Sequence, residues 1–369
     1  MGNHYIEVLM RKLKNQLTPM CYLPSGKLVC YSSGLLIVYE NGKIIQKLHL
    51  PLSLKEKYFG WSKWLYRLFR MGIRASEAIN ESHIVYSVGN YIYEVDLSTG
   101  DVSEGFFCGE GIRPLIITTV KNNIEFDDGL YFGGYLGNDS KNPVHIYKRI
   151  GIDNWKAVYT FPQGTINHVH ALVNDSYRNC LWAFTGDFGD SSAIWKITNN
   201  FKQVDRIFYN DQKYRACVIF ALPEGLLYAT DGPFVENHIY LLNLSTYVLN
   251  DIMPISGSCI YGCKWKDNFV FSSTVEGDGR NMSKLEWLFT RKRGSGIVDN
   301  YVHLYSGNIK DGFKELYKER KDKMPFYTFQ FGVFKFPYGE NNSDKLFFQP
   351  IATSENDLCL LEISENNNN

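Results

Sequence analysis

A short motif that recurs along the chain indicates the fold. Residues 152–158 read IDNWKAV, residues 198–204 read TNNFKQV, and residues 310–316 read KDGFKEL. Each copy places Asp or Asn in a turn, an aromatic residue shortly after it, and then lysine. Asx side chains hydrogen-bond to the backbone of turns, and an aromatic side chain can pack beneath a hairpin. Because the motif repeats, it predicts one such hairpin in each of several similar structural units.

Short strands flank these turns and come in groups. Alternating apolar and polar residues predict a first group at Leu28–Tyr31, Leu35–Tyr39 and Lys43–Leu48, with turns at 32–34 and 41–42. A second group is predicted at Ile84–Val88, Tyr91–Asp96 and Val102–Phe107, and later groups begin near Leu130, His168, Val218, Ile260 and Phe331. A spacing of roughly 45 to 65 residues between equivalent turns is typical of propeller blades that carry loop insertions.

The sequence therefore predicts an all-β fold, a β-propeller of seven blades with a short helical insertion, with six or eight blades as alternatives. We expect a single domain over residues 1–369, with insertions at about 51–80 and 277–300. The last group supplies only three strands, at 331–336, 345–349 and 358–363. The segment Tyr5–Met10 is expected to complete it, because pairing the start of the chain with its end removes exposed strand edges.

Two segments depart from the strand pattern. Residues 58–79 have apolar residues at helical spacing, with basic residues between them. We expect an insertion helix that packs on the propeller. The alternative is contact with an anionic membrane surface through Trp61, Trp64, Arg67 and Arg70. Residues 277–300 hold several arginines and glycines around an apolar run and predict a mobile loop or an extra hairpin.

Composition limits the class of partner and the compartment. The chain has 39 Lys and Arg residues against 39 Asp and Glu residues, so it lacks the global positive charge of most nucleic-acid-binding proteins, and we expect no nucleic-acid partner. The eight cysteines are scattered through apolar runs and predict buried thiols; the pair Cys259 and Cys263 lacks a second pair at zinc-ligand spacing. Without an export signal or a long apolar run, we expect a cytoplasmic monomer that needs no metal or other cofactor.

The strongest candidate for chemistry is a pair of histidines. Residues 167–170 read NHVH at the start of a predicted strand. Because residues two apart on a strand point to the same face, His168 and His170 are expected to project together. Such a pair suits metal binding or proton transfer, and it equally suits structural histidines that bond to neighbouring loops.

Other polar residues recur near the predicted strand ends that would border one mouth of a propeller. We assign His168, His170, Tyr135 and Glu276 as candidate catalytic residues. The candidate substrate-binding residues are Arg113, Arg215, Asp187, Asp231 and Gln330. Arginines offer rigid forks for carboxylates, and tyrosine offers a stacking face and a hydroxyl, so a pocket of this composition favours an acidic carbohydrate.

The turn motif resembles degenerate Asp-box hairpins of the sialidase-like (BNR-repeat) propellers, whose fuller pattern is Ser-x-Asp-x-Gly-x-Thr-Trp. The run from Gly133 to Asp187, with TDGP at 230–233, resembles uncharacterised bacterial and archaeal members of that group. The likeness spans most of the chain. It implies a propeller, and in true sialidases it would imply an arginine triad, to which Arg113 and Arg215 would contribute. Arg113 stands in Ile112-Arg113-Pro114 rather than in the family's Phe/Tyr-Arg-Ile-Pro pattern, and no third arginine is identified.

The resemblance and the candidate residues together suggest two classes of function. The first is an enzyme of the lyase or glycosidase type that acts on an acidic oligo- or polysaccharide, with histidine or tyrosine as base and an arginine that holds the carboxylate. The second is a non-catalytic propeller that binds a glycan or a protein, because the fold serves binding as readily as catalysis.

Overall fold

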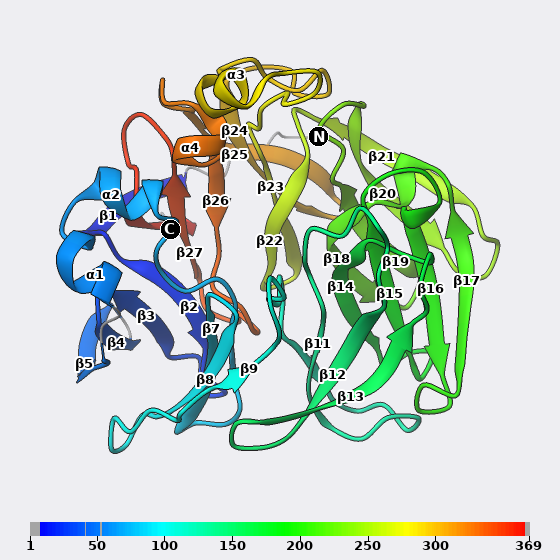
Figure 1. Cartoon of the computed structure of the whole chain (residues 1–369), viewed down its shortest axis with the longest axis horizontal. Coiled ribbons are helices and arrows are strands. Elements are labelled where there is room, and N and C mark those ends of the chain that lie inside the picture. The colour runs from blue at the N-terminus through cyan, green and yellow to red at the C-terminus, as the bar shows by residue number, and fades with distance from the viewer. Residues whose placement is uncertain (1–7, 41, 52–53, 366–369) are drawn as a thin grey trace. The chain divides into compact units, whose positions relative to one another are not determined.

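Seven small antiparallel sheets make up the fold. The computed structural model describes residues 8–40, 42–51 and 54–365. Within these residues the strands form seven four-stranded sheets, in which neighbouring strands are consecutive in the chain except for one pair that joins the two ends of the chain (Figure 1). The fold is a seven-bladed β-propeller, which confirms the fold class and the blade number expected from the sequence. The chain divides into two compact units, and each is described by itself; the expectation of a single domain over residues 1–369 stays a prediction.

The first unit comprises the chain up to Gly72 and from Tyr261 onward, and β22 begins just before that boundary. Its three sheets are β2 (Thr18–Tyr22), β3 (Leu28–Ser32), β4 (Leu35–Glu40) and β5 (Lys43–His49); β22 (Cys259–Trp265), β23 (Asn268–Ser273), β24 (Tyr301–Asn308) and β25 (Gly312–Arg320); and β1 (Val8–Asn15), β28 (Cys359–Glu365), β27 (Lys345–Ile351) and β26 (Val333–Lys335).

The last of these sheets joins the two ends of the chain. Strand β1 pairs antiparallel with β28, from Val8 opposite Glu365 to Asn15 opposite Cys359. The expected closing strand is therefore confirmed from Val8 onward, and it extends further than predicted; residues 5–7 of the predicted strand lie outside the described residues. This pairing leaves β28 bonded on both sides, which removes a strand edge that would otherwise be open to another chain.

The second unit runs from Ile73 to Ile260 and holds four sheets, each built from strands that are consecutive in the chain. These are β6 (Ser76–Ala78), β7 (His83–Val88), β8 (Tyr91–Asp96) and β9 (Phe106–Phe107); β10 (Thr118–Val120), β11 (Gly129–Gly133), β12 (Val144–Gly151) and β13 (Asn154–Phe161); β14 (His168–Asp175), β15 (Cys180–Gly186), β16 (Ala193–Thr198) and β17 (Gln203–Tyr209); and β18 (Ala216–Leu222), β19 (Gly225–Thr230), β20 (Asn237–Asn243) and β21 (Leu249–Ile255).

The recurring motif forms the turn between the third and fourth strands of three sheets, as predicted. Asp153 and Asn200 adopt positive φ angles of 49° and 48°, a conformation that Asp and Asn tolerate better than most residues. The aromatic residue that follows packs beneath the hairpin. Trp155 lies with its ring centroid 5.1 Å from that of Phe132 in the same sheet, and Phe201 lies 5.2 Å from Phe126 in the loop between β10 and β11 of the neighbouring blade. The motif therefore fixes both a turn and a contact between blades.

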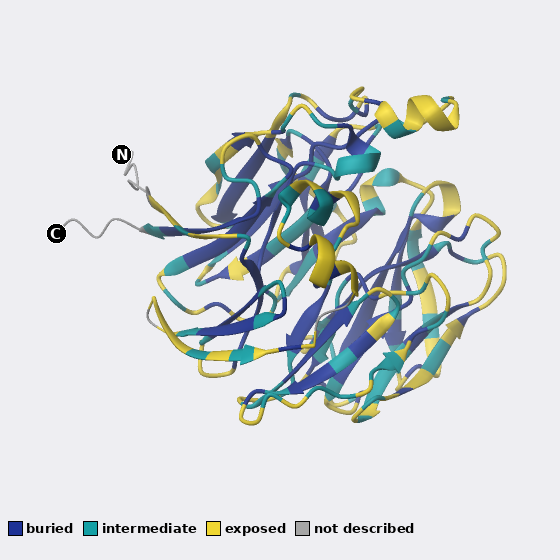
Figure 2. Cartoon of the chain, turned by 60° about the vertical axis from the view of Figure 1, so that its left-hand side comes forward, coloured by how far each residue is buried: buried dark blue, intermediate teal, exposed yellow. Residues whose placement is uncertain are grey.

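Burial follows the position of each strand in its sheet. The second strand of each sheet, such as β15, is buried along most of its length, whereas outermost strands such as β17 are half-buried or exposed (Figure 2). The first strand of three sheets, β2, β6 and β10, lies before the residue where the corresponding predicted group begins, so the sequence did not predict these strands. Strand β18 begins two residues before its predicted group. Strands β6 and β10 have only three residues each, too few to show an alternating pattern, and Pro19 lies in β2, where only an edge position tolerates proline.

The predicted insertion at 51–80 is only partly helical. Two short helices, α1 (Leu54–Phe59) and α2 (Lys63–Leu68), replace the single longer helix. The chain turns between them at Gly60, where a side chain would overlap the Glu56 carbonyl, and Ser62 then caps α2. The prediction was wrong for the end of the segment, because β6 at 76–78 is a blade strand. Residues 52–53 lie outside the described residues.

The segment 277–300 is neither an extended hairpin nor a plain loop. Gly277 and Arg293 pair as an isolated bridge, and between them Ser283 and Glu286 form a capping box that starts helix α3 (Lys284–Phe289). A fourth helix, α4 (Phe326–Phe329), lies against α3, with Tyr327 stacked on Trp287. Among the described residues, no helix has the length and apolar character needed to cross a membrane.

Candidate functional site

The two histidines predicted from the sequence meet at the start of β14. The pairing register between β14 and β15 shifts at His170, since Val169 lies opposite Thr185 and Ala171 opposite Phe184. Irregularities of this kind redirect a side chain relative to the regular strand. The Nε2 atoms of His168 and His170 lie 3.0 Å apart, and both side chains are buried. The expectation that they project together is therefore confirmed.

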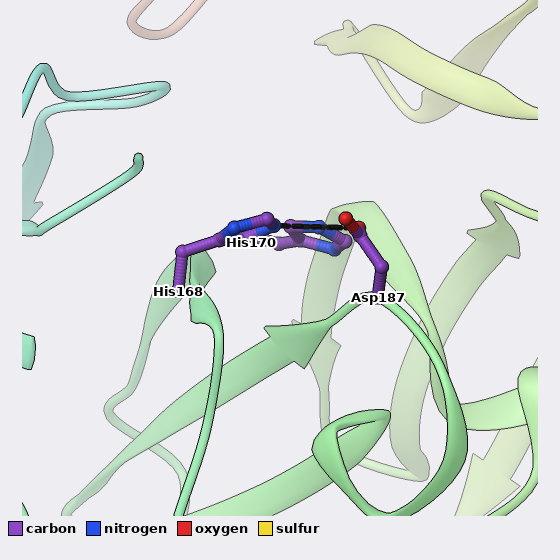
Figure 3. Close-up of side chains that lie close together, drawn as sticks. All are labelled: His168, His170 and Asp187. Carbon is purple, nitrogen blue, oxygen red and sulfur yellow. Dashed lines mark hydrogen bonds and ion pairs between the residues drawn. The ribbon is translucent and has the colours of Figure 1, made fainter. Parts of the chain in front are cut away.

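Asp187 completes a compact cluster with the histidines (Figure 3). It follows β15 directly, and its Oδ1 atom lies 3.3 Å from Nε2 of His168 and 3.2 Å from Nε2 of His170. The same oxygen lies 3.1 Å from a guanidinium nitrogen of Arg215. Arg215 ends the short 3-10 turn η2 (Gln212–Tyr214) and enters β18. One carboxylate oxygen thus faces three nitrogen atoms.

A second carboxylate lies behind Arg215. Asp231 follows β19, and its Oδ2 atom lies 3.5 Å from Nε of Arg215 and 3.3 Å from the sulfur of Cys217. Cys217 was interpreted from the sequence only as a buried thiol. Arg215 precedes β18 and the pairing register shifts at Cys217, so no regular strand spacing in the sequence signals that the two side chains share a site.

Tyr135 forms the other side of the cluster. Its ring centroid lies 4.4 Å from that of His168, and the guanidinium of Arg74 lies 4.9 Å above the tyrosine ring. Backbone hydrogen bonds of 3.1 and 3.2 Å join Tyr135 to Arg113, which is exposed. Arg74 was not predicted as a site residue, because its neighbours were assigned to a helix.

The electrostatics follow from burial and from these contacts. Burial alone would raise the pKa of Asp187, but its contacts with both histidines and the charge of Arg215 outweigh burial and hold that pKa well below its usual value. Burial lowers the pKa of His170 and raises that of Tyr135. Burial also raises the pKa of Asp231, against the opposing charge of Arg215. At neutral pH the site therefore contains an ionised Asp187 and a protonated Tyr135.

Seven of the nine predicted site residues lie in the second unit, and five of them, His168, His170, Tyr135, Asp187 and Arg215, contact one another. Asp231 lies against Arg215, and Arg113 joins through the backbone of Tyr135. Glu276 and Gln330 belong to the first unit. Glu276 is buried beside Val275, which pairs with Gly332, and Gln330 ends α4 with a φ of 72°. Their assignment to the same site stays a prediction.

A separate hollow lies in the second unit. It has a volume of about 580 Å³ and is lined by residues of the strands around β10 to β12, among them Lys121, Asp128, Lys148 and Arg149. Lys148 is paired with Asp127, and Arg149 with Glu94. The hollow shares no residue with the histidine cluster, and two of its basic groups are paired with carboxylates, so the cluster remains the better candidate for chemistry.

Comparison with known proteins gives the fold and no family. No family model and no curated protein sequence matches the chain. Among solved structures, a chain of the mitotic checkpoint complex is similar at a TM-score of 0.52 and 11% identity, over 97% of this chain and 90% of that one. A prolyl endopeptidase is similar at a TM-score of 0.50 and 12% identity, over 92% of this chain and 46% of that one. These likenesses show the propeller fold. The narrower resemblance to sialidase-like propellers stays a prediction.

Proposed function

We propose that this chain binds an acidic oligo- or polysaccharide at the histidine cluster and acts on it as a lyase or glycosidase. The supporting observation is the gathering of two histidines, a tyrosine, an arginine and two carboxylates around the ends of β11, β14, β15 and β19. Groups of unlike charge that are brought together in this way, with their pKa values displaced by burial, are found more often at functional sites than elsewhere.

In the lyase form of the proposal, each group has a definite role. A neutral histidine of the pair removes the proton on the carbon next to the uronate carboxylate, and the exposed Arg113 pairs with that carboxylate. The bond between the sugar carbon and the glycosidic oxygen then breaks, a carbon–carbon double bond forms, and Tyr135 returns a proton to the departing oxygen. The lowered pKa of His170 and the raised pKa of Tyr135 suit these roles, because each group is then in the required protonation state at neutral pH.

The test is a screen of the purified protein against acidic polysaccharides. Ultraviolet absorbance detects unsaturated uronates, and reducing ends detect hydrolysis. We expect product that is lost in His170→Ala and Tyr135→Phe and kept in His145→Ala. His145 is a suitable control because it lies in the same unit on β12, and its ring bonds to Thr160 instead of to the cluster. Product of equal yield in all three variants would contradict the proposed site.

The alternative is a non-catalytic propeller that binds a glycan or a protein. One structure of similar fold is a component of a mitotic checkpoint complex, and a propeller can serve as an assembly surface as readily as an enzyme. Binding of a polysaccharide without product, measured by affinity electrophoresis, would support this alternative. Neither binding nor product with any acidic glycan would contradict both glycan proposals.

A second candidate is contact with an anionic membrane surface, and it is favoured by the segment around α1 and α2. Trp61 and Trp64 are 77% and 55% exposed, and Tyr58 and Phe69 are exposed beside them. The only acidic residue between 54 and 70, Glu56, is buried, so the exposed charges there are basic. Aromatic and basic side chains together suit a membrane interface with anionic lipids.

The prediction that Arg67 contacts the membrane surface was wrong, because this side chain is buried. Its side chain is only 1% exposed and is paired with Asp322 and Asp357. The contact would instead use Trp61, Trp64 and Arg70, which is exposed. We expect sedimentation with phosphatidylserine vesicles but not with phosphatidylcholine vesicles, and loss of sedimentation in the double variant Trp61→Ala, Trp64→Ala. Tyr177→Ala, which removes an exposed aromatic ring elsewhere, is the control; equal sedimentation by the double variant would contradict the contact.

A further inference from the structure

We infer that His168, His170 and Asp187 bind a divalent transition-metal ion, although the expectation from the sequence was that the protein needs no metal. The three ligand atoms are Nε2 of each histidine and Oδ1 of the aspartate, and their separations are 3.0, 3.2 and 3.3 Å. The side chains converge on a common point from β14 and from the residue that follows β15 (Figure 3). The inference can be tested apart from the proposed glycan activity, because the ion can be measured without substrate. With the ion bound, both Nε2 lone pairs are engaged, and the histidine-base role proposed above is then excluded.

The hydrogen bond on the far side of His168 fixes which of its nitrogens is available. Nδ1 of His168 lies 2.8 Å from the carbonyl oxygen of Leu136, and a carbonyl can only accept a hydrogen bond. Nδ1 therefore carries the proton, and in the neutral ring Nε2 presents a lone pair. A backbone carbonyl on the second ring nitrogen is the usual way in which a metal-binding histidine is held in the correct tautomer.

Nε2 of His168 and Oδ1 of Asp187 are then two acceptor atoms that face each other at short distance. A proton on Nε2 of His170 can be donated toward His168 or toward Asp187. Either donation leaves the lone pair of His168 Nε2 and the carboxylate oxygen of Asp187 3.3 Å apart, with no proton between them when His168 is neutral. A cation placed between the three atoms satisfies all of them at once. This is the physical reason for a metal ion here rather than a network of hydrogen bonds.

The distances also suit the coordination geometry of a first-row metal. Bonds of about 2.0 to 2.2 Å to imidazole nitrogen and carboxylate oxygen would place an ion about 1 Å from the plane of the three atoms. Three ligands on one side of an ion leave positions on the other side for water or a ligand. Two histidines and one carboxylate select Zn²⁺, Mn²⁺, Fe²⁺ or Co²⁺ over Ca²⁺ and Mg²⁺, which prefer sites made only of oxygen.

The surroundings support this set of ligands over another that shares His170. Arg215 bonds to Oδ1 of Asp187 and takes one of its lone pairs, which leaves the other for an ion. Asp187 is 33% exposed, so an ion can enter from its side. A second group of His170, Cys217 and Asp231 also lies close together, but all three are buried, and Cys217 already lies against Asp231.

The test is metal binding by the full chain after treatment with a chelator and dialysis. We expect about one Zn²⁺ or Mn²⁺ per chain by elemental analysis after equilibrium dialysis, and no retention of Ca²⁺. Co²⁺ should give a visible absorption band typical of nitrogen and oxygen ligands. Both signals should disappear in His168→Ala and in Asp187→Asn, whereas His145→Ala should keep them.

Folding is monitored by circular dichroism, so that loss of metal can be separated from loss of structure. Asp187→Asn keeps the size of the side chain and gives a result even when His168→Ala does not fold. The inference would be overturned if the wild-type chain bound none of Zn²⁺, Mn²⁺, Fe²⁺ and Co²⁺ stoichiometrically. Undiminished binding by a folded Asp187→Asn variant would also overturn it. Metal binding in a chain without glycan activity would sustain this inference and contradict the proposed enzyme.

Discussion

Gly186 lies directly against the imidazole ring of His170. A Cβ atom built on Gly186 would overlap Cε1 and Nε2 of that ring, so the absence of a side chain at 186 is what allows His170 to reach the cluster. The glycine ends β15, one residue before Asp187, and it therefore sets the distance between the two groups that share a hydrogen bond.

Gly186→Ala is expected to displace His170 and to impair the site. Overpacking at a buried position costs about 1–3 kcal/mol of unfolding free energy, and here it also separates His170 from Asp187. We expect a lower midpoint in urea together with loss of Co²⁺ absorption. Gly137→Ala is the matched control, because nothing lies within 4 Å of a Cβ at that nearby loop position. A fully active, metal-binding Gly186→Ala variant would show that the ring position is not critical.

Removal of the buried arginine of α2 should destabilise the first unit strongly. Arg67 is paired with Asp322 and Asp357 and also donates to the carbonyl of Phe329. Arg67→Met leaves Asp357 without its cation and leaves Asp322 paired only with Lys321, and breaking a buried ion pair costs about 3–5 kcal/mol. Lys57→Met, at an exposed position on α1, should change the unfolding free energy by less than about 0.5 kcal/mol. Equal urea midpoints for the two variants would contradict a structural role for Arg67.

The thiols should be inert in the folded protein. All eight cysteines are buried, and burial raises the pKa of both Cys108 and Cys180 to about 12. At pH 8 the reactive thiolate would then be about one ten-thousandth of each of these two groups, before access is considered. We expect almost no reaction with a disulfide reagent in native buffer and reaction of all eight thiols in guanidinium. Rapid labelling of the native chain would indicate that a thiol is exposed by local opening.

Strand β1 should be required for full thermal stability and for a monomeric protein. A chain that begins after Asn15 lacks the strand that covers β28 and exposes a row of backbone donors and acceptors. We expect a lower melting temperature and the appearance of dimers or aggregates in size-exclusion chromatography. A chain that begins at Val8 keeps every described β1 pair and serves as the control. A monomeric, equally stable chain without β1 would show that this pairing contributes little.

The sequence by itself determined the repeat and therefore the fold. The Asx-aromatic turns at 153–155, 199–201 and 311–313 are local signals, since turn conformation and the packing of the next aromatic residue depend on a few neighbouring residues. The pairing of the two chain ends was predicted because the last group of strands has only three members and lacks a fourth. The strands that the sequence did not reveal, such as β6 and β10, are too short to carry a periodic pattern and are held by their neighbours in the sheet.

Tertiary structure decided the candidate site. His168 and His170 were predicted as a pair because their spacing is local, but Asp187, Arg215 and Asp231 reach them only through the arrangement of β14, β15, β18 and β19. The proton on Nδ1 of His168 depends on the carbonyl of Leu136, which is 32 residues away in the chain. No pattern in the sequence fixes a distance between residues so far apart, because that distance is set by the packing of one blade on the next.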